Sequence, residues 1–99
     1  MLEVEQVFSS YGRVKVMSVI MKSDELNISE ITRRSGISHS SVSAHLEFLV
    51  EAGMLTEKRF NRIRIFRVNR SNPYAEILQR FMADWKSLDA PQAVGIGFN

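Results

Sequence analysis

Basic side chains gather in one part of the chain, between Leu55 and Arg70. This segment holds six basic residues and one acid, although the net charge of the whole 99-residue chain is only +2. The basic residues are Lys58, Arg59, Arg62, Arg64, Arg67 and Arg70. Clustered lysine and arginine bind polyanions by neutralising phosphates and releasing counterions. The cluster therefore favours a nucleic-acid partner, and the alternative is a solvated hairpin face that keeps the protein soluble.

A second set of candidate side chains is small and polar and follows Gly36. Ser38 is a good N-cap for a helix whose first turn would stay exposed. The first residues of this helix that could face a groove are His39, Ser40, Ser41, Ser43 and Ala44. Small side chains let a helix lie close to base edges, but serine reads bases only weakly. We expect DNA contacts here, with modest specificity that DNA shape assists.

Other kinds of chemistry find little support in the sequence. The absence of cysteine excludes disulfides, thiolate catalysis and cysteine-ligated zinc. Two histidines, His39 and His45, are too few for a metal site built from histidine alone. No serine lies in a Gly-x-Ser-x-Gly elbow and no glycine-rich phosphate loop occurs. We therefore expect no catalytic residues, no bound metal and no cofactor.

Two helices joined by a tight turn are expected to position the small polar residues. Ser29 would cap a short helix through Ser35, and Gly36, which has access to positive φ, would end it. A second helix is expected from Ser38 to about Ala52. Its inward stripe would be Val42, Leu46, Leu49 and Val50. This arrangement is a helix-turn-helix unit.

Arg33 and Arg34 close the first of these two helices. Basic residues there complement the helix dipole, and in helix-turn-helix proteins that helix also crosses the DNA backbone. Both interpretations stay open at this point. The preceding residues, 24–27, break the helical period and are interpreted as a connection, with Ile28 as a short β-bridge.

A β-hairpin is expected directly after the second helix. Residues 54–59 and 62–68 alternate apolar with polar side chains, and Leu55, Ile63 and Ile65 would face inward. The turn between the runs contains asparagine, which tolerates the left-handed conformation. The hairpin residues expected to reach DNA are Lys58, Arg59, Asn61, Arg62 and Arg64. Arginine at such a tip is favoured at the phosphate backbone and in the minor groove.

Helices are also expected on both sides of this unit. Residues 2–8 predict a short helix or an ordered arm, and residues 11–22 a helix capped by Ser9 or Ser10. A last helix starts at Pro73. Its apolar residues Tyr74, Leu78, Phe81, Trp85 and Leu88 recur at coiled-coil spacing. Because three helices and the hairpin already serve the core, we expect this face to form a homodimer interface, aided by residues 2–8. The alternative is a helix packed only on its own domain.

The predicted fold class is α+β, a three-helix core with a β-hairpin wing. One domain would span residues 1–88, with a dimerisation helix at about 73–88 and a flexible tail at 89–99. No apolar run is long enough for a membrane span or a signal peptide, so we expect a cytoplasmic protein without a membrane partner.

The stretch ISEITRRSGISHSSVSAHLEFLVEAGML, residues 28–55, resembles the winged helix-turn-helix regulators of the ArsR and MarR type. The residues that carry the resemblance are Glu30-Ile31, Gly36, Ser38, Val42-Ser43, His45-Leu46, Leu49 and Gly53. The hairpin and the helix after Pro73 also match, especially in compact archaeal members. The resemblance covers roughly residues 9–88, although Gly12-Arg13-Val14 departs slightly from the usual start of the first helix.

The resemblance implies a dimeric transcription regulator that binds double-stranded DNA. The cysteine motif with which ArsR proteins sense metals is absent, so metal sensing does not carry over and any small-molecule effector is left open. A winged helix that contacts proteins within a transcription-related complex is the alternative. The basic wing and the small polar helix start both favour DNA. The operator, the sign of regulation and the regulated genes stay open.

Overall fold

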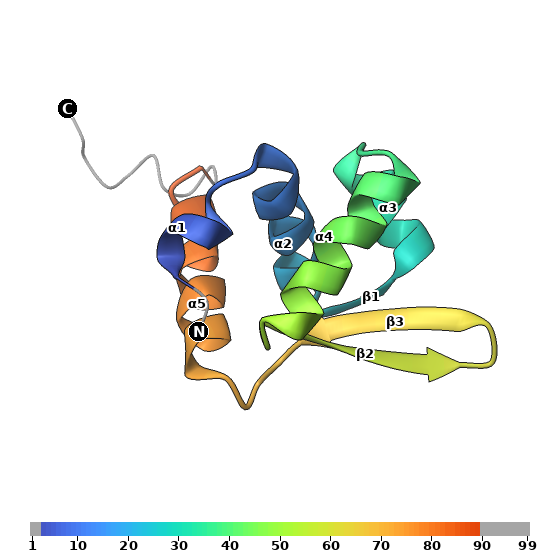
Figure 1. The fold of residues 1–99 in the computed structure, drawn as a ribbon. Coiled ribbons are helices and arrows are strands. Elements are labelled where there is room, and N and C mark those ends of the chain that lie inside the picture. The colour runs from blue at the N-terminus through green and yellow to red at the C-terminus, as the bar shows by residue number, and fades with distance from the viewer. Residues whose placement is uncertain (1–2, 90–99) are drawn as a thin grey trace.

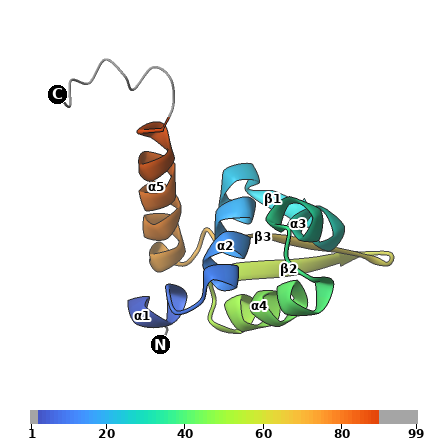
Figure 2. The same cartoon turned by 90° about the horizontal axis from the view of Figure 1, so that it is seen from above.

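The computed structural model describes residues 3–89, which form five helices and three strands. In chain order they are α1 (Val4–Val7), α2 (Tyr11–Ser23), β1 (Glu25–Asn27), α3 (Ile28–Ser35), α4 (His39–Glu51), β2 (Leu55–Phe60), β3 (Ile63–Val68) and α5 (Pro73–Ser87). The strands form one antiparallel sheet in the order β1-β3-β2. The hairpin β2–β3, called the wing below, projects from one end of the molecule, and α1 and α5 lie at the other end (Figures 1 and 2). The predicted α+β winged helix is confirmed.

The core lies between α2, α3, α4 and the base of the sheet, and Val7 of α1 and Ala75 and Leu78 of α5 extend it. The predicted stripe residues Val42, Leu46 and Leu49 are fully buried, and Val50 is half-buried beside them. The other large buried side chains are Met17 and Ile20 of α2, Ile31 of α3, Met54 and Leu55 at the start of the hairpin, and Phe66 of β3. Burial of such a side chain contributes about 1.5–3 kcal/mol, so these contacts hold the two helices of the helix-turn-helix unit against the sheet.

Three of the predicted local signals are confirmed. Gly36 ends α3 in the left-handed conformation at φ 70°, and Asn61 makes the hairpin turn at φ 59°. The Ser38 hydroxyl accepts a hydrogen bond from the Ser41 backbone N–H at 3.3 Å and so caps α4. Each signal is local in the chain, which is why the sequence pattern could reveal it.

The start of α3 differs from the prediction. Asn27, not Ser29, is the N-cap, and its side chain accepts from the Glu30 N–H at 2.8 Å. The residues expected to form a connection include strand β1, and Ile28 opens α3 instead of forming a bridge. Strand β1 pairs with β3, with Leu26 opposite Phe66. A strand of three residues shows no period of its own, and its pairing partner lies far along the chain.

The inward face of the hairpin was predicted only in part. Leu55 is buried as expected, but Ile63 is exposed and Ile65 is only half-buried. The buried residues of β3 are Phe66 and Val68, on the opposite face of the strand. Strand β3 carries apolar side chains on both faces, so alternation alone could not decide which face is buried. Ile63 belongs to the last pair of the hairpin, and it is exposed because the end of the wing extends beyond the helices (Figure 1).

Candidate nucleic-acid interface

The start of α4 presents the small polar side chains to solvent. His39, Ser40, Ser41 and Ala44 are exposed, whereas Ser43 is half-buried. Exposed Ser38 accepts from a backbone N–H as the cap, and its oxygen lies 3.5 Å from the Ser40 hydroxyl. The structure therefore brings the predicted helix residues together on one exposed surface, with Ser43 at its edge.

The wing carries exposed cations at its tip. Lys58, Arg59, Asn61 and Arg62 are all exposed. Within residues 3–89, Lys58 and Arg62 form no ion pair. These two side chains are therefore the wing cations most readily available to a phosphate.

Glu57 holds two of the predicted wing arginines. Arg64 Nε donates to Glu57 Oε2 at 2.8 Å, and Arg59 Nε lies 3.4 Å from the same oxygen. The Arg64 guanidinium also lies 5.2 Å from the centre of the Phe66 ring, and its side chain is only 23% exposed. The hydrogen bond from Arg64 lowers the pKa of the Glu57 carboxyl below its usual value. Arg64 thus connects the wing to the core as well as adding positive charge.

The remaining two cations of residues 55–70 are also paired. Arg67 Nε lies 3.7 Å from a Glu25 carboxylate oxygen, and Arg70 donates to Asp24. Asp24 caps the end of α2 and Glu25 lies in β1, so both acids are remote in sequence from the arginines that they bind. The six basic residues consequently carry less free positive charge than their number indicates.

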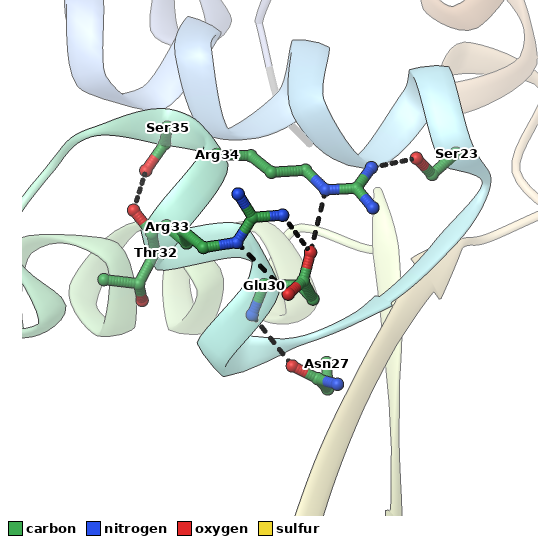
Figure 3. Close-up of polar contacts among 7 residues, drawn as sticks. All are labelled: Ser23, Asn27, Glu30, Thr32, Arg33, Arg34 and Ser35. Carbon is green, nitrogen blue, oxygen red and sulfur yellow. Dashed lines mark hydrogen bonds and ion pairs between the residues drawn. The ribbon is translucent and has the colours of Figure 1, made fainter.

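Arg33 and Arg34 form a charged cluster with Glu30 on α3 (Figure 3). Arg33 Nη2 and Arg34 Nε lie 2.8 and 3.0 Å from the same Glu30 oxygen, and Arg34 Nη1 donates to the Ser23 hydroxyl of α2 at 2.8 Å. The hydrogen bonds from Arg33 and Arg34 lower the pKa of Glu30 to about 2. Both arginines are exposed, so a phosphate could share them with Glu30.

Removing the charge of Glu30 tests whether these arginines lie beside DNA. We expect Glu30→Gln to strengthen duplex binding a few-fold and to steepen the salt dependence by up to about one unit, because the carboxylate no longer competes with phosphate. Fluorescence anisotropy at several salt concentrations measures both quantities. Glu76→Gln, the same change on exposed α5, is the matched control. Equal effects of the two variants would place Arg33 and Arg34 away from the DNA.

Arg13 joins three helices and was not singled out by the sequence pattern. Its Nη1 donates to the Gln6 carbonyl of α1 at 2.6 Å and to the Ser9 hydroxyl at 3.2 Å. Its guanidinium lies 3.7 Å from the centre of the Phe48 ring of α4. His45, on the same helix, is partly buried, and this burial together with the nearby Arg13 lowers its pKa. Gly12 leaves room for the imidazole ring of His45, because a Cβ at Gly12 would lie 2.7 Å from His45 Nε2.

An exposed apolar surface covers α5 and the adjoining α1, and we call it the α1–α5 surface. Its exposed residues are Val4, Phe8, Tyr74, Ile77, Phe81, Trp85 and Leu88. The Phe81 ring lies 6.3 Å from that of Phe8 and 5.9 Å from that of Trp85, between ring centres. A groove of about 350 Å³ runs between the two helices. Four of the five predicted interface residues thus lie on one exposed stripe.

Leu78, the fifth predicted interface residue, is only 8% exposed and packs in the core at the floor of this groove. Ile77 was missed, although its spacing from Tyr74 and Phe81 is that of a helical face. The short helix expected within residues 2–8 is present as α1, and its exposed Val4 belongs to this surface, while its part in a dimer stays a prediction. The predicted tail at 89–99 lies almost entirely outside the described residues.

The described part of the chain contains neither a metal-binding cluster nor a membrane-spanning helix. Among residues 3–89, no group of three histidine, aspartate or glutamate side chains could hold a metal ion. The helices of the same residues are each too short or too polar to cross a bilayer.

Comparisons with known proteins agree with this architecture. A family model described as bacterial regulatory protein, arsR family, matches residues 10–57, which run from the cap of α2 into β2. No curated protein matches the sequence significantly.

Among solved structures, the antimony-specific transcriptional repressor AntR aligns with a TM-score of 0.69 at 16% identity, over 83% of this chain and 72% of its own. AF1382 from Archaeoglobus fulgidus aligns with a TM-score of 0.68 at 16% identity, over 89% and 99%. The ArsR family transcriptional regulator RHA00566 aligns with a TM-score of 0.59 at 18% identity, over 84% and 82%. At these identities the similarity establishes the fold.

Proposed function

Residues 10–57 belong to the arsR family of bacterial regulatory proteins, and from this premise we propose that the chain is a sequence-specific regulator of transcription that binds double-stranded DNA as a homodimer. One observation carries the proposal. The exposed start of α4 and the cationic tip of the wing lie at the same end of the molecule, opposite the α1–α5 surface (Figures 1 and 2). DNA and a second protomer can therefore be bound at the same time.

In this proposal α4 enters the major groove. Its first turn is small enough for close approach, and its free N–H groups face a phosphate. The residues in contact would be Ser38, His39, Ser40, Ser41, Ser43 and Ala44. Serine can accept or donate but makes no bidentate pair with a base, so each contact would discriminate weakly.

The wing and α3 contribute mainly backbone contacts. Lys58 and Arg62 are available without breaking an ion pair, and Asn61 lies between the strands at the tip. Arg59 and Arg64 would contact a phosphate while they also keep their ion pairs with Glu57. Arg33 and Arg34 would likewise contact a phosphate while they keep their ion pairs with Glu30. Such contacts position the protein without selecting a sequence.

The α1–α5 surface supplies the proposed homodimer interface. Monomeric proteins rarely expose a continuous apolar patch of this kind, and large aromatic residues dominate the energy of protein interfaces. A two-fold dimer would place the two copies of α4 about one duplex turn apart, roughly 34–36 Å, so the operator would be a pseudo-palindrome.

The wing contact is tested by Arg62→Ala. Removal of one phosphate-binding cation is expected to lower the slope of log affinity against log salt by about one unit, and to weaken binding to all duplexes similarly. Anisotropy titrations of labelled duplexes at several salt concentrations measure the slope. Arg80→Ala on exposed α5 removes the same charge at the other end of the molecule and should leave the slope unchanged. An unchanged slope for Arg62→Ala would remove the wing from the interface, and failure of the unmodified protein to bind any duplex would refute the proposed function.

A further inference from the structure

The tip of the wing carries an exposed apolar pair between its cations. Phe60 and Ile63 are directly opposite each other across the two strands, on either side of the Asn61 turn. Their exposed fractions are 65% and 49%. This pair has no place in the core of the protomer, because it lies at the far end of the hairpin (Figure 1).

The direction of these side chains follows from the strand register. Side chains of directly paired residues project from the same face of a sheet. The pairs Glu57–Phe66 and Arg59–Arg64 belong to the face that carries the buried Phe66 ring. Phe60 and Ile63 therefore belong to the outer face, away from the helices, and the Glu57–Arg64 ion pair does not cover them.

The charge around this pair distinguishes it from the other exposed apolar surface. Arg59 precedes Phe60, Arg62 precedes Ile63, and Lys58 lies on the same face of the hairpin as Phe60. All three cations are exposed. The α1–α5 surface differs in that charges of both signs adjoin it, with exposed Glu3 and Glu5 beside Val4 and exposed Arg80 beside Phe81. An apolar tip among cations fits a polyanion that also offers apolar surface, and stacked base pairs between two phosphate strands are such a partner.

We infer that the tip is a wedge that bends DNA: Phe60, supported by Ile63, enters the minor groove and partly unstacks one base step, while Lys58 and Arg62 hold the flanking phosphates. This inference rests on the proposed DNA-binding function. Apolar side chains that enter the minor groove kink duplexes in this way. Stacking of an aromatic side chain on a base contributes binding energy, and because it neutralises no phosphate it should not add to the salt dependence.

The wedge would also supply sequence preference that the serines of α4 lack. Pyrimidine–purine steps such as TA unstack most easily, so the cost of insertion depends on the step. We therefore expect the protein to prefer duplexes with a flexible step where the wing tip reaches the minor groove. That preference arises from deformability and needs no hydrogen bond to a base edge.

The test uses the full chain and 30-base-pair mixed-sequence duplexes that carry a donor and an acceptor dye at their ends. One duplex contains TA steps at regular intervals and the other contains none. We expect the unmodified protein to raise energy transfer, which reports bending, and to prefer the TA-containing duplex. Phe60→Ala should weaken binding by about fivefold to a hundredfold, abolish the rise in energy transfer and leave the salt slope unchanged.

Two further variants sharpen the result. Phe60→Leu keeps an apolar wedge and should retain most of the bending, whereas Thr56→Ala, on the outer face at the base of the same strand, should behave like the unmodified protein. Phe60 is largely exposed, so its replacement leaves the core intact, which circular dichroism checks.

The outcomes separate the wedge from the proposed function. If the unmodified protein binds with a clear salt slope while Phe60→Ala binds and bends equally well, the wedge is refuted and the function stands. If Phe60→Ala alters sedimentation but not bending, the tip contacts protein and the wedge is likewise refuted. If the unmodified protein binds neither duplex, both proposals fail.

Discussion

Replacing both Phe81 and Trp85 by glutamate is expected to convert a dimer into folded monomers and to weaken duplex binding by about 10²–10⁴-fold. The two side chains are 47% and 64% exposed, so their replacement removes little from the core of the protomer. Charges on the α1–α5 surface would oppose burial of that surface against a second copy. The loss of DNA affinity follows because two linked half-sites bind with a high effective concentration and two separate ones do not.

Sedimentation velocity and anisotropy measure the two effects in the same samples. The matched control is Arg80→Gln with Ser87→Glu, which makes the same change in net charge at exposed positions of α5 that line neither the groove beside α1 nor the one beside α2. The control should remain a dimer and bind DNA normally. A Phe81→Glu, Trp85→Glu variant that still sediments as a folded dimer would show that the interface lies elsewhere.

Phe66→Ala is expected to reduce the free energy of unfolding by about 3–5 kcal/mol. Phe66 is fully buried in β3, the central strand of the sheet, and pairs with Leu26 on one side and Glu57 on the other. Its ring also supports the Arg64 guanidinium. A domain of this size has a total stability of about 5–15 kcal/mol, so the variant should be partly unfolded well below the melting temperature of the unmodified protein.

Urea unfolding at one fixed protein concentration measures this loss, since the stability of a dimer depends on concentration. Phe60→Ala, the same change on the same hairpin at an exposed site, should stay within about 0.5 kcal/mol of the unmodified protein. Comparable losses for the two variants would mean that the wing is not anchored through Phe66.

Local signals allowed most of the helix-turn-helix unit to be predicted from the sequence. Gly36, Ser38 and the stripe from Val42 to Leu49 each act within a few residues, so their pattern is visible without a structure. Strand β1 was missed because only its pairing with β3 defines it. Long-range pairing leaves no mark on a segment of three residues.

The free charge of the candidate site was harder to predict from the sequence than the helices and strands that carry it. The sequence located the cations of the wing, but it could not show that Glu57 binds Arg64 or that Glu25 and Asp24 lie beside Arg67 and Arg70. The first pairing depends on the register of the hairpin, and the other two depend on β1 lying beside β3. Lys58 and Arg62 therefore emerge as the principal free wing cations only from the structure.

In the proposed dimer, the contacts of Arg13 would link assembly to DNA recognition. A single guanidinium holds α1 through the Gln6 carbonyl and packs on Phe48 of α4. If α1 lies against a second protomer, as proposed, a shift of α1 would reach α4 through this one side chain. Thermodynamic reciprocity then requires that any factor by which dimerisation tightens DNA binding is the factor by which DNA tightens the dimer. A half-site occupied by one protomer would thus recruit the second protomer. The fraction of operator bound would then rise more steeply with protein concentration than it would for two independent half-sites.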